Sequence, residues 1–176
     1  MFLSPMFLSF KRSTFYLLSA LLIGSLFISQ IATAATIDIK QIDSIQKESQ
    51  IAKDKKLPLL ILFSMTHCPY CVLIKENFLV PMLISGDYTN KVLIREINIE
   101  ENIEIMGLSG KIQASSQFAA NMGVSMYPTM IFVDSQGCQL ADSIVGINTP
   151  SLFGGRIDDA IDEANQKIQH GLTQCN

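Results

Sequence analysis

The chain has 176 residues, of which 16 are acidic and 13 are Lys or Arg, and its formal net charge is -3. A protein that binds the phosphate backbone of a nucleic acid needs a basic surface, and no basic stripe occurs in this sequence. Nucleic acid is therefore excluded as an expected partner.

The N-terminus has the three-part pattern of a secretory signal peptide. Lys11 and Arg12 precede an uncharged apolar run that closes on Ala32-Thr33-Ala34. We predict cleavage after Ala34, which leaves residues 35–176 as one exported domain of ordinary size, long enough to bury a core. The alternative is an uncleaved membrane anchor, but the run is polar in places and just short of the about 20 residues that a spanning helix needs. We expect a periplasmic or otherwise exported protein that meets the membrane only through its uncleaved signal.

The first half of the exported part reads as alternating helices and strands. Ile42, Ile45 and Ala52 recur near helical spacing, and the continuous apolar run before the first cysteine is typical of a strand covered on both faces. Pro81 predicts a break or kink in the second helix. The expected elements are a helix over 39–53, a strand over 57–63, a helix over 71–84 and a strand over 91–99.

The second half begins with a polar stretch, 100–114, which we interpret as a loop or insertion. Gly154 and Gly155 weaken the first turn of the closing helix, so we start that helix near Arg156. The other expected elements are a helix over 115–123, strands over 128–134 and 138–146 joined by a turn, and the closing helix to Gly171. Strands that alternate with helices indicate an α/β fold with a parallel sheet, to which the final hairpin adds an antiparallel edge.

The stretch "CPYC" stands between the first strand and the second helix. Cys68 directly precedes Pro69, a residue favoured at the first helical position. The helix N-terminus lowers the pKa of a cysteine there, because unpaired N–H groups and the helix dipole stabilise the thiolate. A protonated His67 acts in the same direction. Cys71, one turn further on, is better placed to resolve a mixed disulfide than to start one, so the motif predicts thiol–disulfide exchange.

Other uses of these cysteines remain open. A structural Cys68–Cys71 disulfide closes a short loop and gains little chain entropy. A structural zinc site needs four ligands, and the sequence has no second CxxC motif, so we predict no metal. A sharper alternative is a copper(I) carrier, because Met65, His67, Met126 and the two cysteines form a set of soft ligands. A non-catalytic binding module is a third possibility.

The chain resembles the thioredoxin superfamily, and within it the exported thioredoxin-related proteins. An apolar strand running into "CPYC" and the segment "GVSMYPTMIFVDSQG" carry the resemblance, which spans about residues 39–169. It implies a thioredoxin fold: a central mixed sheet of about four strands flanked by helices, with an N-terminal helical extension. It also implies a nucleophilic Cys68, a resolving Cys71 and a cis Pro128 packed against the pair.

The same resemblance implies the function. Cysteine-containing protein substrates would dock in extended form beside Tyr127, Pro128 and Thr129, and a redox partner protein would regenerate the pair. No dissociable cofactor is required, and a role as a reductase or in disulfide repair is favoured over one as an oxidase.

The sequence departs from the family pattern in three places. Leu62 stands where the family often has a buried acid that relays protons, so proton transfer must use water or another group. His67 replaces a frequent aromatic residue, and we expect it, with Pro69 and Tyr70, to modulate the active site. Pro69-Tyr70 is the glutaredoxin dipeptide, but the segment around Pro128 lacks the glutaredoxin "TVP" pattern, which argues against glutathione.

Cys138 and Cys175 form a second candidate pair. Cys138 begins the last strand and Cys175 lies just past the last helix. In this fold the helix returns toward the hairpin turn, so we predict a structural Cys138–Cys175 disulfide. Two unpaired thiols, or an intermolecular bond through Cys175, are the alternatives.

Overall fold

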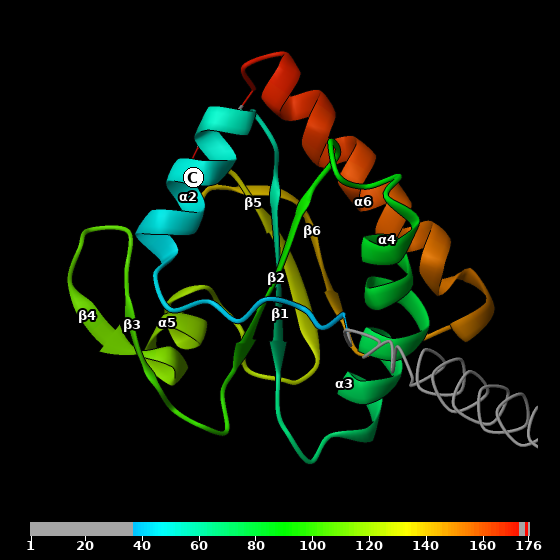
Figure 1. Cartoon of the computed structure of the whole chain (residues 1–176), viewed down its shortest axis with the longest axis horizontal. Coiled ribbons are helices and arrows are strands. Elements are labelled where there is room, and N and C mark those ends of the chain that lie inside the picture. Colours follow the sequence, from blue (N-terminus) through cyan, green and yellow to red (C-terminus); the bar gives the residue numbers. More distant parts are fainter. Residues whose placement is uncertain (1–36, 173–174, 176) are drawn as a thin grey trace, which may run out of the picture. The chain divides into compact units, whose positions relative to one another are not determined.

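A computed structural model describes residues 37–172 and 175 of the chain (Figure 1). The predicted signal peptide, residues 1–34, and its cleavage site lie outside the described residues. The helices and strands are α2 (Ile45–Lys55), β1 (Leu59–Ser64), α3 (Pro69–Ile74), the π-helical turn η2 (Lys75–Leu79), α4 (Val80–Ser85), β2 (Leu93–Asn98), β3 (Glu104–Met106), β4 (Ile112–Ala114), α5 (Ser115–Asn121), β5 (Thr129–Val133), β6 (Gln139–Val145) and α6 (Pro150–Gln169).

A mixed four-stranded sheet in the order β2-β1-β5-β6 forms the centre of the domain. β1 runs parallel to β2 and antiparallel to β5, and β6 pairs antiparallel with β5. Every residue of β1 is buried, as expected for a central strand with helices on both faces. The predicted fold class, a mixed sheet of about four strands flanked by helices, is confirmed.

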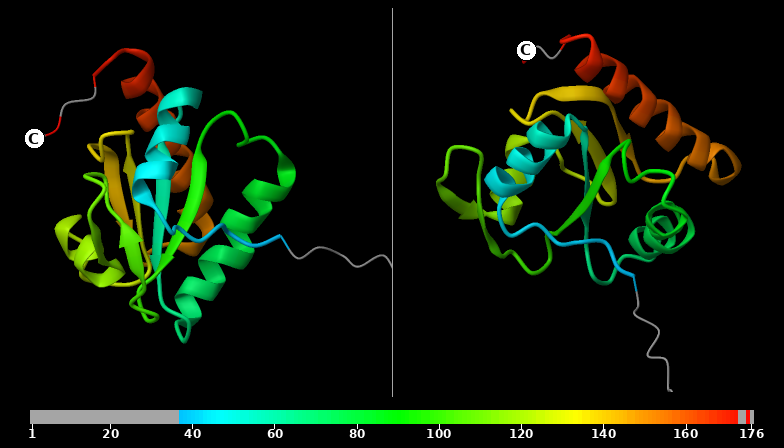
Figure 2. Two further views of the ribbon diagram at one scale, coloured as in Figure 1. Left: turned by 60° about the vertical axis from the view of Figure 1, so that its left-hand side comes forward. Right: turned by 45° about the horizontal axis from the view of Figure 1, so that its top comes forward.

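The two faces of the sheet have separate cores. On one face α3, α4 and α6 pack over Leu60, Leu62 and their neighbours, with Phe153 of α6 fully buried among them. On the other face α2 and α5 cover Leu59, Ile61 and the rest of the opposite side chains. Figure 2 shows these two helical layers from two further directions. Alternate residues of β1 therefore serve opposite cores, as the pleat of a strand requires.

The N-terminal helix begins at Ile45, later than the predicted Ile39. Ser44 caps it, and the Ser44 Oγ accepts a hydrogen bond of 3.2 Å from the backbone N–H of Lys47. The residues before the cap are extended and run alongside β2, where Ile42 N donates to Glu96 O at 2.9 Å and Glu96 N donates to Lys40 O at 3.0 Å. The apolar spacing that predicted an earlier helix start thus arises partly from an extended segment.

Two other boundaries differ from the prediction. The stretch 100–114 contains an antiparallel hairpin, β3–β4, anchored by the fully buried Ile105. The closing helix begins at Pro150 instead of near Arg156. Proline suits the first helical position, and Gly154 lies where a Cβ would meet the ring of Phe78 at 3.7 Å. Packing of this first turn on the core outweighs the low helix propensity of the glycines.

The helical run from Pro69 to Ser85 continues through Pro81 without a break. The turn ahead of the proline is widened, with Val80 N donating to Lys75 O in a π-helical pattern. Since proline has no N–H to donate, this widened turn accommodates Pro81 where the sequence predicted a break or kink. Among the helices of residues 37–172, none is both long and apolar enough to cross a membrane.

Candidate active site

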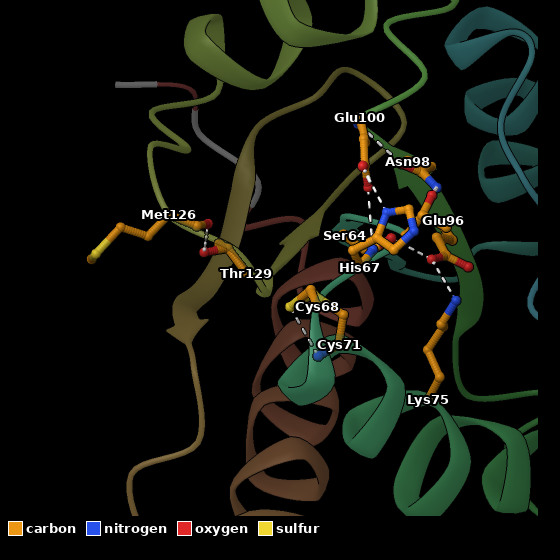
Figure 3. The surroundings of a disulfide bond; sticks show 11 residues. Ser64, His67, Cys68, Cys71, Lys75, Glu96, Asn98, Glu100, Met126 and Thr129 are labelled. Atoms are coloured by element: carbon orange, nitrogen blue, oxygen red, sulfur yellow. Dashed lines mark hydrogen bonds and ion pairs between the residues drawn. A yellow bond between two sulfur atoms is a disulfide. The ribbon is translucent and has the colours of Figure 1, made fainter.

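Cys68 and Cys71 lie at the start of α3 and are joined by a disulfide, with their Cα atoms 5.2 Å apart (Figure 3). Cys68 is the N-cap residue of the helix, with extended backbone angles, and Pro69 is the first helical residue. Cys68 is half-buried, whereas Cys71 has no exposed surface. The two sulfurs are thus unequal, since Cys68 is partly open to solvent and Cys71 is not.

The helix N-terminus supplies hydrogen-bond donors to Cys68. The backbone N–H of Cys71 donates to Cys68 Sγ at 3.2 Å, and the N–H groups of Cys71 and Val72 also point to the Cys68 carbonyl oxygen at 3.0 and 3.1 Å. These donors lie at the positive end of the helix dipole. After reduction, the Cys71 N–H and the helix dipole stabilise a negative charge on the Cys68 sulfur, and the thiolate is the form that attacks a disulfide.

His67 is held beside Cys68 by a carboxylate that the sequence analysis did not identify. The His67 Nδ1 lies 2.9 Å from Glu100 Oε1, and the His67 backbone N–H donates to Glu100 Oε2 at 3.2 Å. The hydrogen bond with the His67 side chain is the main cause that lowers the pKa of Glu100 below its usual value. The carboxylate offsets any positive charge on His67, so the effect of His67 on Cys68 is smaller than the sequence suggests.

The strand order explains the position of Glu100. Because β1 and β2 are parallel, their carboxyl ends meet at one edge of the sheet, where β1 leads to His67 and β2 to Glu100. Asn98 joins the two loops by donating to Thr66 Oγ1 at 2.8 Å and accepting from the Glu100 N–H at 3.0 Å. The sequence did offer a signal for Glu100: it is a polar residue directly after the second predicted strand, which was expected to run parallel to the strand that leads to His67.

Pro128 stands at the same edge of the sheet. Thr129 of β5 pairs with Phe63 of β1, next to the residues that lead into the cysteine loop, and the Tyr127–Pro128 peptide bond is cis. Pro128 and Thr129 are buried and Tyr127 is half-buried. The Thr129 hydroxyl donates to the Met126 carbonyl at 2.8 Å, so this side chain is occupied within the fold. Contact between Thr129 and a substrate would involve its backbone.

A buried polar group lies beneath the cysteine loop. Glu96 of β2 pairs in register with Leu62, the position where an acid was expected and is missing. Its Oε1 accepts from the Ser64 hydroxyl and lies 3.1 Å from the Lys75 ammonium. Its Oε2 is buried without a hydrogen-bond partner among the described residues, an arrangement that costs about 1–3 kcal/mol. The sequence did not reveal Glu96, because Arg95 and Glu96 are adjacent charged residues and nothing in "REIN" shows which of them is buried.

The soft ligands of the copper hypothesis are not all gathered at the cysteines. The Met126 side chain is 61% exposed and extends away from the disulfide in Figure 3. Within residues 37–172 and 175, no cluster of three or more His, Cys, Asp or Glu side chains is arranged to hold a metal ion. The geometry adds no support to a copper(I) carrier.

A second disulfide joins Cys138 and Cys175, whose Cα atoms lie 4.8 Å apart. Cys138 is buried, and its N–H donates to Asp134 Oδ1 at 2.9 Å in the turn between β5 and β6. Val133 at the end of β5 pairs with Leu59 at the start of β1. This disulfide therefore lies at the end of the sheet opposite Cys68, away from the active-site cysteines.

The site and fold together define a class of protein. A half-buried cysteine caps a helix, is bonded to a buried cysteine one turn on, and lies at the sheet edge that also holds a cis proline. This is a thioredoxin-fold protein with a disulfide-forming CxxC pair. The chain belongs to the thioredoxin-like domain family, whose model matches residues 45–161.

Comparison with solved structures finds thioredoxins. A thioredoxin from Malassezia sympodialis is 20% identical, with 76% of this chain and 98% of that chain covered and a TM-score of 0.50. Mitochondrial thioredoxin 3 from Saccharomyces cerevisiae is 22% identical, with coverage of 68% and 94% and a TM-score of 0.46. A poplar thioredoxin h is 22% identical, with coverage of 69% and 97% and a TM-score of 0.48. No curated protein matches the chain significantly.

Proposed function

We propose that this protein is an exported thiol–disulfide oxidoreductase that reduces or exchanges disulfides in protein substrates. The observation that carries the proposal is the inequality of the two cysteines: Cys68 is reachable and receives an N–H hydrogen bond at its sulfur, whereas Cys71 is buried and bonded to it. A merely structural disulfide needs neither feature. The pair works without a dissociable cofactor.

The reaction follows from these positions. The Cys68 thiolate attacks one sulfur of a substrate disulfide, which forms a mixed disulfide and releases the other substrate sulfur as a thiolate that takes up a proton. Cys71 then loses its proton and attacks Cys68 Sγ. The Cys68–Cys71 bond forms, the bond to the substrate breaks, and the second substrate thiol departs. Two electrons have passed to the substrate, and the dithiol of a redox partner protein must return them.

Exposed apolar side chains support a polypeptide as the substrate. Tyr70 lies between the cysteines and is 63% exposed, Met126 is 61% exposed and Met65 is 36% exposed. Large apolar groups in water favour contact with another chain. An extended substrate would lie along the Met126–Pro128 segment, beside Cys68.

Export rests on the N-terminal sequence. A basic start, an apolar run and Ala32-Thr33-Ala34 support removal of residues 1–34, and an oxidising compartment allows both disulfides to persist. N-terminal sequencing of the protein recovered from the periplasm of an expressing bacterium tests this proposal. A mature chain that starts at Ala35 is expected, and an intact N-terminus on a membrane-bound protein would refute it.

The activity is tested by disulfide reduction and by redox titration. The reduced protein should reduce the disulfides of insulin with dithiothreitol as electron source, and Cys68→Ser should abolish this reaction. A binding module would instead keep its function in Cys68→Ser. The reduction potential of the Cys68–Cys71 pair gives the direction: a value near about −270 mV indicates a reductase, and one near about −120 mV an oxidase.

A further inference from the structure

The second step of the proposed reaction needs a proton acceptor inside the protein. Cys71 must lose a proton before it attacks Cys68, because the thiolate is the nucleophile. Cys71 has no exposed surface, so bulk water reaches its sulfur poorly. Leu62, on the strand that leads to the cysteines, cannot accept a proton. The acceptor must come from another element.

Glu96 is a buried carboxylate whose position in the fold suits a proton acceptor for Cys71. It pairs with Leu62 across β1 and β2, so its side chain lies on the sheet face that α3 covers. Its partner Lys75 follows Cys71 by one helical turn, and the Lys75 N–H donates to the Cys71 carbonyl. Residues one turn apart share a helix face. Lys75, on the helix face of Cys71, therefore links this helix to Glu96 (Figure 3).

The contacts of Glu96 leave one oxygen available. Ser64 and Lys75 both bind Oε1, while Oε2 is buried and has no partner among the described residues. Buried polar atoms are almost always hydrogen-bonded, and exceptions call for an explanation. An acceptor held free for a proton that arrives once in each reaction cycle supplies one.

We propose that Glu96 accepts the proton of Cys71 when the mixed disulfide is resolved, directly or through Ser64 or one water molecule. This inference rests on the proposed function. In this step the Cys71 S–H bond breaks and Glu96 is protonated. The Cys71 sulfur then bonds to Cys68 Sγ, and the Cys68–substrate bond breaks. Glu96 later returns the proton to water, so the carboxylate is regenerated.

The groups around Glu96 fit this role. Lys75 is the charged side chain paired with it, at 3.1 Å, and Cys71 is the titratable group on the helix above. The neighbouring ions Arg95 and Lys40 both bind Glu48 instead. Lys75 and Ser64 hold Oε1 of the carboxylate in place, the first as an ion pair and the second by donating its hydroxyl hydrogen.

The test separates the two chemical steps. Reduced protein is mixed with a synthetic peptide disulfide, quenched with acid at intervals, and analysed by mass spectrometry for the Cys68 mixed disulfide. In Glu96→Gln the mixed disulfide should form at the wild-type rate but decay about 100-fold more slowly at pH 7, within the range that a general base contributes. The slowing should shrink as the pH rises, because hydroxide then removes the proton. Glu96→Asp should restore part of the decay rate.

Glu48→Gln is the matched control, because Glu48 is also fully buried but both of its oxygens are paired. It should leave both rates unchanged. Equal decay in the wild type and Glu96→Gln, or a slowing that is the same at every pH, overturns the role of Glu96 alone. A wild-type protein that forms no mixed disulfide overturns the proposed function, and this inference with it. If urea titrations show that Glu96→Gln does not fold, Glu96→Asp takes its place in the test. A decay rate equal to that of the wild type, or a slowing that is the same at every pH, then overturns the role of Glu96.

Discussion

Removal of the second disulfide should destabilise the domain without changing the chemistry of Cys68. The double variant Cys138→Ser/Cys175→Ser opens a link between residues 37 positions apart. On the chain-entropy model, a loop of this size contributes about 3–4 kcal/mol by restricting the unfolded chain. The Cys68–Cys71 disulfide spans only 3 positions, and the same model gives it about 2 kcal/mol.

Urea unfolding under non-reducing conditions measures both losses. We expect Cys138→Ser/Cys175→Ser to lose about 3–4 kcal/mol and to show a larger m-value, because the unfolded chain expands once it is no longer linked. The control variant Cys68→Ser/Cys71→Ser should lose less and keep nearly the same m-value. In the reduced Cys138→Ser/Cys175→Ser variant, Cys68 should be alkylated at the same rate as in the reduced wild type. A loss below about 1 kcal/mol, or a loss no larger than that of the control, would refute this account of the disulfide.

Three further substitutions test the fold and its electrostatics. Burial raises the pKa of Glu48, but hydrogen bonds and charge from Lys40 and Arg95 outweigh it and lower the pKa overall. Ionised Glu48 therefore stabilises the folded protein above the ordinary glutamate pKa, and this stabilisation is lost as the pH falls. Acid unfolding should depend less steeply on pH in Glu48→Gln. The hydrogen bond with Asp158, followed by burial, raises the pKa of Tyr88 to about 12. The protonated Tyr88 therefore stabilises the folded protein fully below about pH 10, and this stabilisation is lost as the pH rises toward 12. Ultraviolet titration of the wild type should show one tyrosine that ionises near pH 12, and Tyr88→Phe should lack it. Phe153→Ala empties a fully buried site and should cost about 3–5 kcal/mol in urea unfolding.

Local patterns in the sequence were sufficient to predict most of the fold. The apolar run of β1 and the pair Cys68 and Cys71 beside Pro69 predicted a strand that leads into a helix N-terminus, and the structure has both. Turn residues and strand order predicted the β5–β6 hairpin. These features depend on residues close together in the chain, so one sequence is sufficient to recognise them.

The differences arise where distant segments meet. The residues before Ser44 pair with β2, and helix periodicity alone does not distinguish such a segment from a helix. Glu100 reaches His67 only because two parallel strands end at the same edge. Glu96 stands beside the charged Arg95 in the sequence, where nothing local marks it as a core residue, yet it is fully buried. Packing between elements decides these three cases.

The extended segment before α2 also has a consequence for solubility. An outermost strand offers unpaired N–H and C=O groups on which another chain can add. Here Lys40 and Ile42 occupy such groups on Glu96, in the middle of β2. A chain without residues 37–42 would leave this apolar strand open to lateral addition of a second copy, so the extended segment also guards the sheet against aggregation.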